Sequence, residues 1–391
     1  MSLRVGLLCH DSVGGSARVA VELAAGLAHR GHEIHLFSRR APLGVSAPPD
    51  GVTLHTLDGS SVHGAAASKL DTNWSGAEIE ALAGRVANLS RSVGLDVIHF
   101  HYAVPFASVA ERAGRMLAAS RPALVGTLHG TDVSVLGWRP DTRRQLSAIL
   151  PGLDALTTVS QNHAELATRT LRLAEEPRVI PNFVDLARFQ PDPSARANGR
   201  RPRIVHISNF RRVKQPLAMA RIFCEVRRKQ DAELWLVGDG GGMRSVRELL
   251  GRAGFAGEIE RFGLRLDVEH VLPHADVLLV TSRAESFCLA ALEAAACGLP
   301  VVAPRVGGLP ETVVDGHTGV LYEPGDEAGA ARAVVALLAN REPRRRMGAA
   351  AVWHAQQFSA AAVVPRYEQL YHDVLGTTEV EEEELCESSA A

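Results

Sequence analysis

The chain has 391 residues, of which 46% are apolar and 22% charged, and its formal net charge is −2. This length predicts two or three domains, each large enough to bury a hydrophobic core. A charge so close to zero creates no overall field that would favour nucleic acid or a membrane surface as a partner.

Strand and helix patterns alternate along the first half of the chain. Residues 3–9 (LRVGLLC) form an apolar run typical of a buried parallel strand, and a turn with Gly14 and Gly15 leads into a helix over 17–27. The same alternation continues with strands predicted at 33–38, 96–100, 123–128 and 155–159, and helices at 107–119 and 143–150. Repeated right-handed strand–helix–strand units predict a doubly wound α/β domain over residues 1–190.

A second alternating series follows a polar segment, residues 191–202, whose Pro/Gly/Arg-rich composition is typical of a linker. Strands are predicted at 204–208, 233–237, 258–263, 275–280 and 300–303, and helices up to 228 and at 288–296, 328–339, 342–358 and 363–375. They predict a second Rossmann-like domain over 191–376, with a last helix that can cross back to the first. The acidic residues 377–391 are predicted to be a disordered tail. Two such domains are expected to face a central cleft, where parallel sheets bind ligands.

Two carboxylates punctuate the Ala/Leu-rich segment after residue 281. Glu285 stands where a helix is predicted to begin, and Glu293 follows eight residues later. At ~100° and ~1.5 Å per residue the two lie near one face, about 12 Å apart. This separation is similar to that between the sugar and the ribose of a nucleotide-diphospho-sugar, whose diphosphate would face the free N–H groups of the helix start. The spacing alone favours a surface helix that happens to carry two glutamates.

Two further motifs follow predicted strands. Arg211 and Lys214 in the string HISNFRRVK are three residues apart, so on a forming helix they share a face and could hold a diphosphate as it leaves. A solvated basic face is the alternative. The Gly14–Gly15 pair fits either close approach of backbone to a ligand or a turn with positive φ. His129, at a strand end, is most simply a buried histidine satisfied by its neighbours.

Other chemistries lack their motifs. There is no Asp-x-Asp, no clustered zinc-ligand spacing, no P-loop lysine and no G-x-S-x-G, so we expect no metal and no cofactor. The chemistry then depends on positioning and leaving-group stabilisation. Five scattered cysteines, no signal peptide and no apolar run near ~18 residues predict a reduced, cytoplasmic protein outside the membrane.

Taken together, Glu285-x7-Glu293, the segment GGLPE (307–311) and HISNFRRVK resemble the donor site of family-4 retaining glycosyltransferases of the GT-B fold. The resemblance implies that Arg211 and Lys214 bind the donor diphosphate, Glu285 the sugar hydroxyls and Glu293 the ribose. It implies a catalytic set of His129, Arg211, Lys214 and Glu285. The implied donor-binding set is Gly14, Gly15, Asn209, Arg211, Lys214, Gly263, Glu285, Ser286, Phe287, Cys288 and Glu293.

The similarity covers nearly the whole chain. HYAVP, TLHGTDVSVLG, PNFVD and ESFCLAALEAAACGLP resemble the branch of the family that joins UDP-N-acetylglucosamine to L-malate in bacillithiol biosynthesis. For this chain the implied acceptor-binding residues are Ser16, Tyr102, Thr127, Thr131, Arg144 and Ser147. Four positions depart from that branch: Ser147 replaces an arginine, Phe106 a histidine, APLG (41–44) a P-F-R-L, and Cys288 a glycine.

A dicarboxylate needs a fixed cationic partner, which serine cannot supply, and Arg144 on the same helical face is the alternative cation. We therefore expect a reassigned small acceptor, a thiol or hydroxy compound, for example in lincosamide-type S-glycosylation. Transfer to L-malate is the alternative. A non-catalytic nucleotide-sugar binder and a sugar-phosphate epimerase are alternatives of other classes. The expected partners are a UDP- or GDP-sugar, the small acceptor and further copies of the chain in a homo-oligomer.

Overall fold

The computed structural model describes residues 2–12, 14–42, 48–59, 71–192, 194–195 and 199–376. The predicted acidic tail, part of the predicted linker and half of the APLG segment lie outside the described residues. The chain groups into two compact units: Met1–Thr127, Arg144–Thr157 and Val364–Ala391 form the first, and Leu128–Arg143 and Thr158–Val363 the second. This grouping differs from the predicted division at residue 190, while it returns the last helix to the first unit. The predicted domain boundaries remain a prediction.

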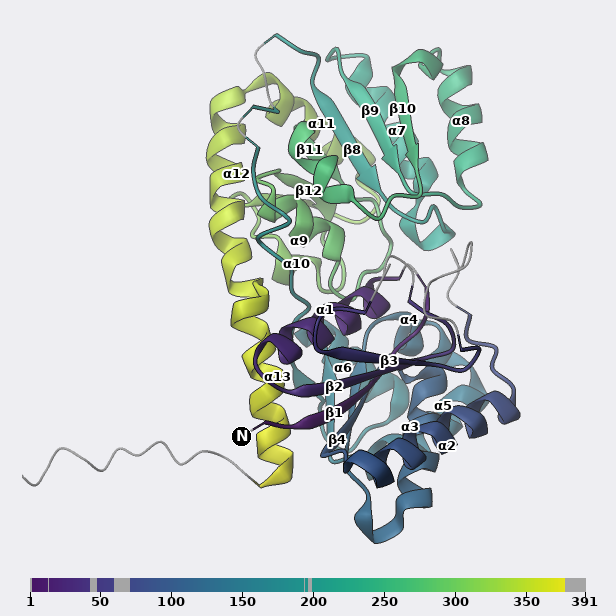
Figure 1. Ribbon diagram of the computed structural model, residues 1–391. Coiled ribbons are helices and arrows are strands. Elements are labelled where there is room, and N and C mark those ends of the chain that lie inside the picture. Colours follow the sequence, from purple (N-terminus) through teal and green to yellow (C-terminus); the bar gives the residue numbers. More distant parts are fainter. Residues whose placement is uncertain are drawn as a thin grey trace, which may run out of the picture. The chain divides into compact units, whose positions relative to one another are not determined.

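The first sheet has seven strands in the order β3-β2-β1-β4-β5-β6-β7 (Figure 1). Its strands are β1 (Arg4–Leu8), β2 (Glu33–Ser38), β3 (Val52–Thr56), β4 (Val97–His101), β5 (Ala123–Leu128), β6 (Ala155–Thr158) and β7 (Arg178–Val179). The helices of this part of the chain are α1 (Gly15–His29), α2 (Gly76–Val93), α3 (Ala103–Leu117), α4 (Thr131–Ser134), α5 (Pro140–Ile149) and α6 (Gln161–Leu171). β1 pairs in parallel with both β2 and β4, so the strand order reverses beside it.

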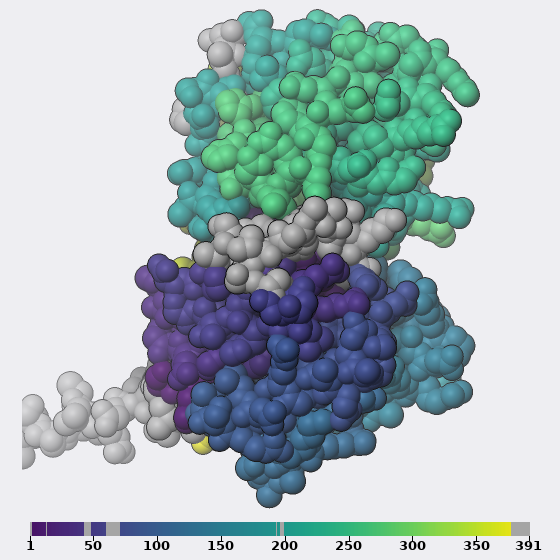
Figure 2. Space-filling view, turned by 45° about the vertical axis from the view of Figure 1, so that its right-hand side comes forward, coloured from purple at the N-terminus to yellow at the C-terminus, as the bar shows by residue number. Residues whose placement is uncertain are grey.

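The second sheet has six strands in the order β10-β9-β8-β11-β12-β13. They are β8 (Arg203–Ile207), β9 (Glu233–Val237), β10 (Ile259–Gly263), β11 (Val277–Leu279), β12 (Val301–Pro304) and β13 (Gly319–Tyr322). The helices of the second half of the chain are α7 (Pro216–Arg227), α8 (Met243–Arg252), α9 (Leu289–Ala296), α10 (Leu309–Thr312), α11 (Glu327–Ala339), α12 (Arg341–Ala355) and α13 (Ala360–Leu375), most of which belongs to the first unit. β8 pairs in parallel with β9 and β11, so this sheet also has a switch point at its centre. In Figure 2, the part of the chain that contains this second sheet is coloured teal to green, and its atoms form one continuous surface.

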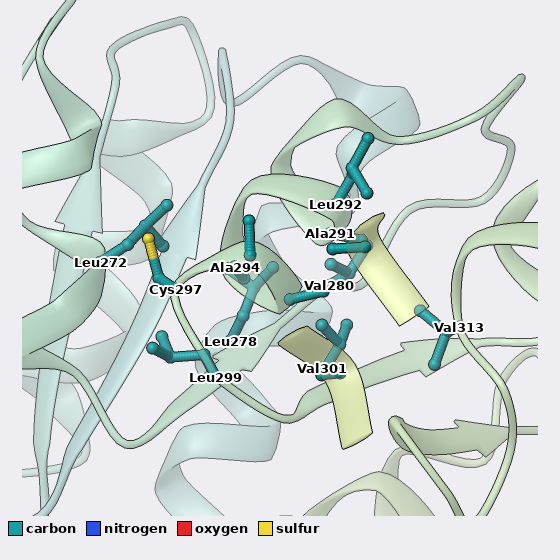
Figure 3. Packing of buried hydrophobic residues seen from close by; sticks show 14 of the residues in the cluster. Leu272, Leu278, Val280, Ala291, Leu292, Ala294, Cys297, Leu299, Val301 and Val313 are labelled. Atoms are coloured by element: carbon teal, nitrogen blue, oxygen red, sulfur yellow. The ribbon is translucent and has the colours of Figure 1, made fainter. Parts of the chain in front are cut away.

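Two apolar clusters cover the two faces of the second sheet. On one face, Ala291 and Leu292 of α9 pack with Leu278 of β11 and Val301 of β12 (Figure 3). On the other face, residues of α7, α8 and α11 pack against β8 and β9. Burying both faces fits a parallel sheet, whose strands are apolar runs. The cores therefore fix the carboxyl ends of β8 and β11, where the predicted donor-site residues begin.

The predicted α/β architecture of two doubly wound parallel sheets is confirmed. The strands predicted at 33–38, 123–128 and 233–237 coincide with β2, β5 and β9. Eight of the described helices and strands were not predicted: β3, α2, α4, α6, β7, α8, α10 and β13. In the described ranges, no helix combines the length and apolar character needed to cross a membrane.

Candidate active site

A partly buried ion pair lies beyond the end of β11. The Lys214 Nζ atom lies 2.6 Å from Glu285 Oε1, and the Ser282 hydroxyl donates to the same oxygen at 2.6 Å. The two charged side chains are only 23% and 10% exposed. Burial opposes the charge of Lys214, but the Glu285 carboxylate outweighs this effect and raises the pKa of Lys214. Lys214 therefore stays protonated at neutral pH.

The loop between β8 and α7 delivers Lys214 to this pair. Residues Arg212–Lys214 form a 3-10 turn, closed by the Lys214 amide, which donates to the Arg211 carbonyl at 2.9 Å. The Thr281 hydroxyl holds the same turn by donating to the Lys214 carbonyl at 2.9 Å. Arg211 and Asn209 are exposed beside it. The cations are thus presented by a short turn before the helix, and the prediction that they share a face of the forming α7 is wrong in this respect.

His206 on β8 stabilises this loop through hydrogen bonds. Its Nδ1 atom donates to the Leu279 carbonyl at 2.9 Å, so its Nε2 atom accepts from the Ser208 hydroxyl at 2.9 Å. The Ser208 oxygen in turn accepts from the Phe210 amide at 3.1 Å. Burial lowers the pKa of His206 to about 4, which keeps the imidazole neutral. The neutral tautomer is what this chain of hydrogen bonds requires.

A pH dependence follows from His206. Its folded pKa lies below the ordinary value of 6.5, so between about pH 6.5 and 4 the unfolded state binds more protons and the free energy of unfolding falls as the pH falls. We expect this group to account for up to about 3 kcal/mol of that loss. Urea denaturation at pH 7.5 and pH 5 should show a smaller pH difference for His206→Gln than for the unmodified protein. An equal pH difference in both would contradict the assignment.

The segment 285–288 is a loop, so one prediction about the glutamates is wrong. α9 begins at Leu289, and Cys288 before it has the left-handed conformation, with φ 78° and ψ 74°. Glu285 therefore precedes the helix, and the helical spacing calculated for the pair does not apply. Glu293 lies inside α9 and is 4% exposed. Burial, with Glu285 adding to it, raises the pKa of the Cys288 thiol to about 12.

Two glycines allow this loop to pack closely on the segment before α10. The Gly308 amide donates to the Glu285 carbonyl at 3.0 Å. A Cβ atom on Gly307 would lie 1.8 Å from the Glu285 carbonyl oxygen, and one on Gly308 would lie 2.1 Å from that of Ser286. Gly307 also has φ +56°, which disfavours other residues. The GGLPE motif thus supports the backbone of Glu285 and Ser286.

Ser286 joins the loop to two segments from the first half of the sequence. Its hydroxyl donates to the His129 carbonyl at 2.5 Å, and its carbonyl accepts from the Ser160 hydroxyl at 2.6 Å. Next to this contact, the Glu311 carboxylate accepts from the amides of Gln161 and Asn162 at 2.8 and 3.0 Å, which caps α6. His129 itself is 7% exposed. The structure therefore brings His129 to the loop that carries Glu285.

Two other predicted donor residues occupy defined places in the second unit. Gly263 ends β10 with φ +65°, and its carbonyl accepts from the Gly238 amide at 2.6 Å. The Phe287 ring is 2% exposed and packs edge-on against Phe358, with centroids 5.6 Å apart. Phe287 is therefore a core anchor of the loop, and only its backbone remains for a ligand.

The remaining donor residues belong to the first unit. Gly14 caps α1 with φ −67° and ψ 152°, and no side chain caps this helix. Gly15 is the first residue of α1, and both glycines are exposed. The alternative of a turn with positive φ is wrong for Gly14. Exposed amides at an uncapped helix start suit an anion.

The predicted acceptor residues differ in how accessible they are. Tyr102 is 3% exposed with φ +81°, and the Thr127 hydroxyl, fully buried, bonds His99 Nε2 and Thr157 Oγ1 at 2.7 Å each. The other predicted residues are all at least partly exposed on helices: Ser16 on α1, Thr131 on α4, and Arg144 and Ser147 on α5. Thr127 therefore belongs to a buried hydrogen-bond network that its position in the sequence did not indicate.

The position where Phe106 stands is apolar. The Phe106 ring is fully buried and packs edge-on against His10 and Trp74, with centroids 4.7 and 5.5 Å apart. His10 also packs edge-on against Tyr102 at 5.1 Å. These four rings form an aromatic cluster in the first unit.

Among the described residues, no group of three His, Cys, Asp or Glu side chains could hold a metal ion.

Comparison with known families places both halves of the chain among glycosyltransferases. Residues 13–188 match the model described as "Glycosyltransferase Family 4", and residues 201–340 the model "Glycosyl transferases group 1". The chain is 33% identical to N-acetyl-alpha-D-glucosaminyl L-malate synthase of Bacillus anthracis, over 96% of this chain and 98% of that protein.

Solved structures show the same fold at lower sequence identity. Sucrose-phosphate synthase from Thermosynechococcus elongatus aligns with a TM-score of 0.79 and 21% identity, over 96% of this chain and 100% of that one. The Anabaena protein HepE, solved with UDP and glucose, aligns with a TM-score of 0.77 and 18% identity, over 94% and 99% of the two chains.

Proposed function

The chain belongs to family 4 of the glycosyltransferases, and from this premise we propose that it transfers a sugar from a nucleotide-diphospho-sugar to a small acceptor with retention of configuration. The observation that carries the proposal is the Lys214–Glu285–Ser282 cluster at the end of β11. A preformed ammonium beside a carboxylate suits a ligand with a diphosphate next to a sugar, because each group serves one part of it. The UDP complex of HepE supports a nucleotide donor by analogy.

In this proposal each residue has one task. Lys214 and Arg211 stabilise the departing diphosphate, with Asn209 nearby and the exposed amides of Gly14 and Gly15 as further donors. The backbone of Ser286, Phe287 and Cys288 and the Glu285 carboxylate orient the sugar, and Glu293 and Gly263 the nucleoside. His129 contacts the donor sugar. The departing phosphate accepts the acceptor's proton in a front-face attack, so no side chain is assigned as base.

The proposed acceptor is a small thiol or hydroxy compound other than malate. Ser147 supplies no cation for a dicarboxylate, and Phe106, packed against His10 and Trp74, supplies none either. A natural-product step such as lincosamide-type S-glycosylation is one setting with such an acceptor. The second candidate is transfer of N-acetylglucosamine to L-malate, which the 33% identity to the Bacillus anthracis enzyme favours. Arg144, one turn before Ser147 on α5, is the cation that would then bind malate.

The test measures nucleotide release from UDP-N-acetylglucosamine, other UDP-sugars and GDP-sugars, with and without L-malate. Release that does not respond to malate, with a slow background hydrolysis of one donor, is the expected result. A malate-dependent burst of UDP would select the second candidate, and donor held unchanged would select a non-catalytic binder. EDTA should leave the rate unchanged, because we propose a metal-independent reaction. Product NMR should show retention at the anomeric carbon.

A further inference from the structure

A cavity of about 790 Å³ opens in the second unit beside the donor-site loop. It lies where the starts of α7, α8 and α11 meet the ends of β12 and β13. Arg211 and Ser282 contribute to its lining, whereas Lys214, Glu285 and Glu293 do not. Its size is typical of sites for small molecules. The cavity is thus a neighbour of the donor site and is built from mostly different residues.

The lining of this cavity carries an excess of positive charge. Four guanidinium groups face one carboxylate: Arg211, Arg212, Arg221 and Arg283 against Glu327. Arg221 pairs with Glu327, its Nε atom donating at 2.8 Å. The side chains of Arg212 and Arg283 are exposed and make no hydrogen bond or ion pair within the described part of the chain. In a chain whose net charge is −2, this is a local excess of cations.

Backbone and apolar groups complete the lining. α7 and α8 both begin at the cavity, and neither has a side-chain cap, so their positive ends add to the field of the arginines. The apolar part of the cavity wall consists of Pro216, Leu217 and Tyr322, and Leu217 is 39% exposed. The Tyr322 hydroxyl is engaged with the Val280 carbonyl at 3.1 Å, which leaves the ring as the available surface. The combination suits a ligand with a phosphate group and a compact body of sugar or nucleoside size.

We propose that this cavity is a second anion site, which binds a small phosphorylated metabolite while a donor occupies Lys214 and Glu285. Arg212 and Arg283 bind its phosphate, and the walls hold the rest of the molecule. Ser282 connects the two sites, because it lines the cavity and its hydroxyl donates to Glu285. The Arg283 amide also donates to the Val213 carbonyl at 2.8 Å, next to Lys214. A bound phosphate therefore changes the donor KM through this segment.

The test is calorimetric titration of the full chain with inorganic pyrophosphate in the presence of saturating UDP. We expect one binding event, weakened at least about tenfold in the Arg212→Ala, Arg283→Ala double variant and unchanged in Arg247→Ala, an exposed arginine of α8 outside the lining. Both replaced side chains are exposed, so the double variant should keep the unmodified melting temperature.

Two results would overturn the proposal: UDP abolishes pyrophosphate binding, or the double variant binds as tightly as the unmodified protein. If the protein does not bind UDP at all, the donor assignment fails independently. The titration without UDP then compares the double variant with Lys214→Ala. Loss of binding only in the double variant supports the second site, and loss only in Lys214→Ala rejects it.

Discussion

Replacing Lys214 by alanine is expected to lower kcat/KM for the nucleotide-sugar donor by about 10²–10³-fold, because it removes a preformed cation from the leaving diphosphate. The Nζ atom is already fixed 2.6 Å from Glu285, so it needs no reorganisation when the phosphate departs. Lys214→Arg keeps the charge but not the compact ammonium, and we expect it to restore only part of the activity. Initial rates of nucleotide release at several donor concentrations measure both effects.

Stability must be measured beside activity for this variant. Without its cation, the Glu285 carboxylate is left 10% exposed with the Ser282 hydroxyl, which should lower the free energy of unfolding by about 2–3 kcal/mol. Lys229→Ala is the matched control, since this exposed lysine after α7 has no part in the site and should change neither quantity. If Lys214→Ala turned over donor within about threefold of the unmodified rate, the assigned role would be wrong.

In the donor loop, the sequence predicted the helix correctly but did not predict where it begins. The Ala/Leu-rich composition after residue 288 correctly indicated a helix. Composition cannot show that Cys288 adopts φ +78°, because that conformation is imposed by tertiary contacts on a residue that rarely adopts it. The helix therefore starts four residues later than Glu285. The functional spacing of the two glutamates arises from a loop and a helix together.

Missed elements have local reasons. α2 carries a complete capping box, in which Ser75 and Glu78 bond each other's backbone, and this signal could have been found in the sequence. α8 follows a glycine-rich turn, and its apolar residues Met243, Val246, Leu249 and Leu250 have helical spacing, so this helix also could have been found in the sequence. β13 follows a turn in which the Val314 amide donates to the Thr318 hydroxyl. The strand has only four residues, which is too short to show an alternation of apolar and polar residues.

Contacts between distant segments were beyond sequence reasoning. Ser286 meets His129 and Ser160, which lie 157 and 126 residues away, and Glu311 caps α6 across 150 residues. A single serine or glutamate carries no sign of such a partner, since its neighbours in sequence are unremarkable. His129 was nevertheless singled out through the family resemblance, and the structure brings its carbonyl to the predicted loop. The predicted contact of His129 with the donor sugar stays a prediction.

Replacing Gly307 by alanine is expected to damage both folding and activity. The new Cβ atom would lie 1.8 Å from the Glu285 carbonyl oxygen, which belongs to backbone and cannot rotate away. Left-handed strain and overpacking together should lower the free energy of unfolding by about 2–4 kcal/mol. A shift of Glu285 by about 1 Å should also reduce kcat about 100-fold at temperatures where the variant is folded. Urea denaturation and nucleotide release measure the two effects.

Gly316 separates the two causes. It has φ +75°, close to the conformation class of Gly307, but an added Cβ would meet nothing within 4 Å. Gly316→Ala therefore adds backbone strain alone and should lower the free energy of unfolding by about 1 kcal/mol without changing kcat. The difference between the two alanine variants isolates the clash with Glu285. Equal losses in both would mean that the glycine pair supplies only backbone freedom and does not position the donor loop.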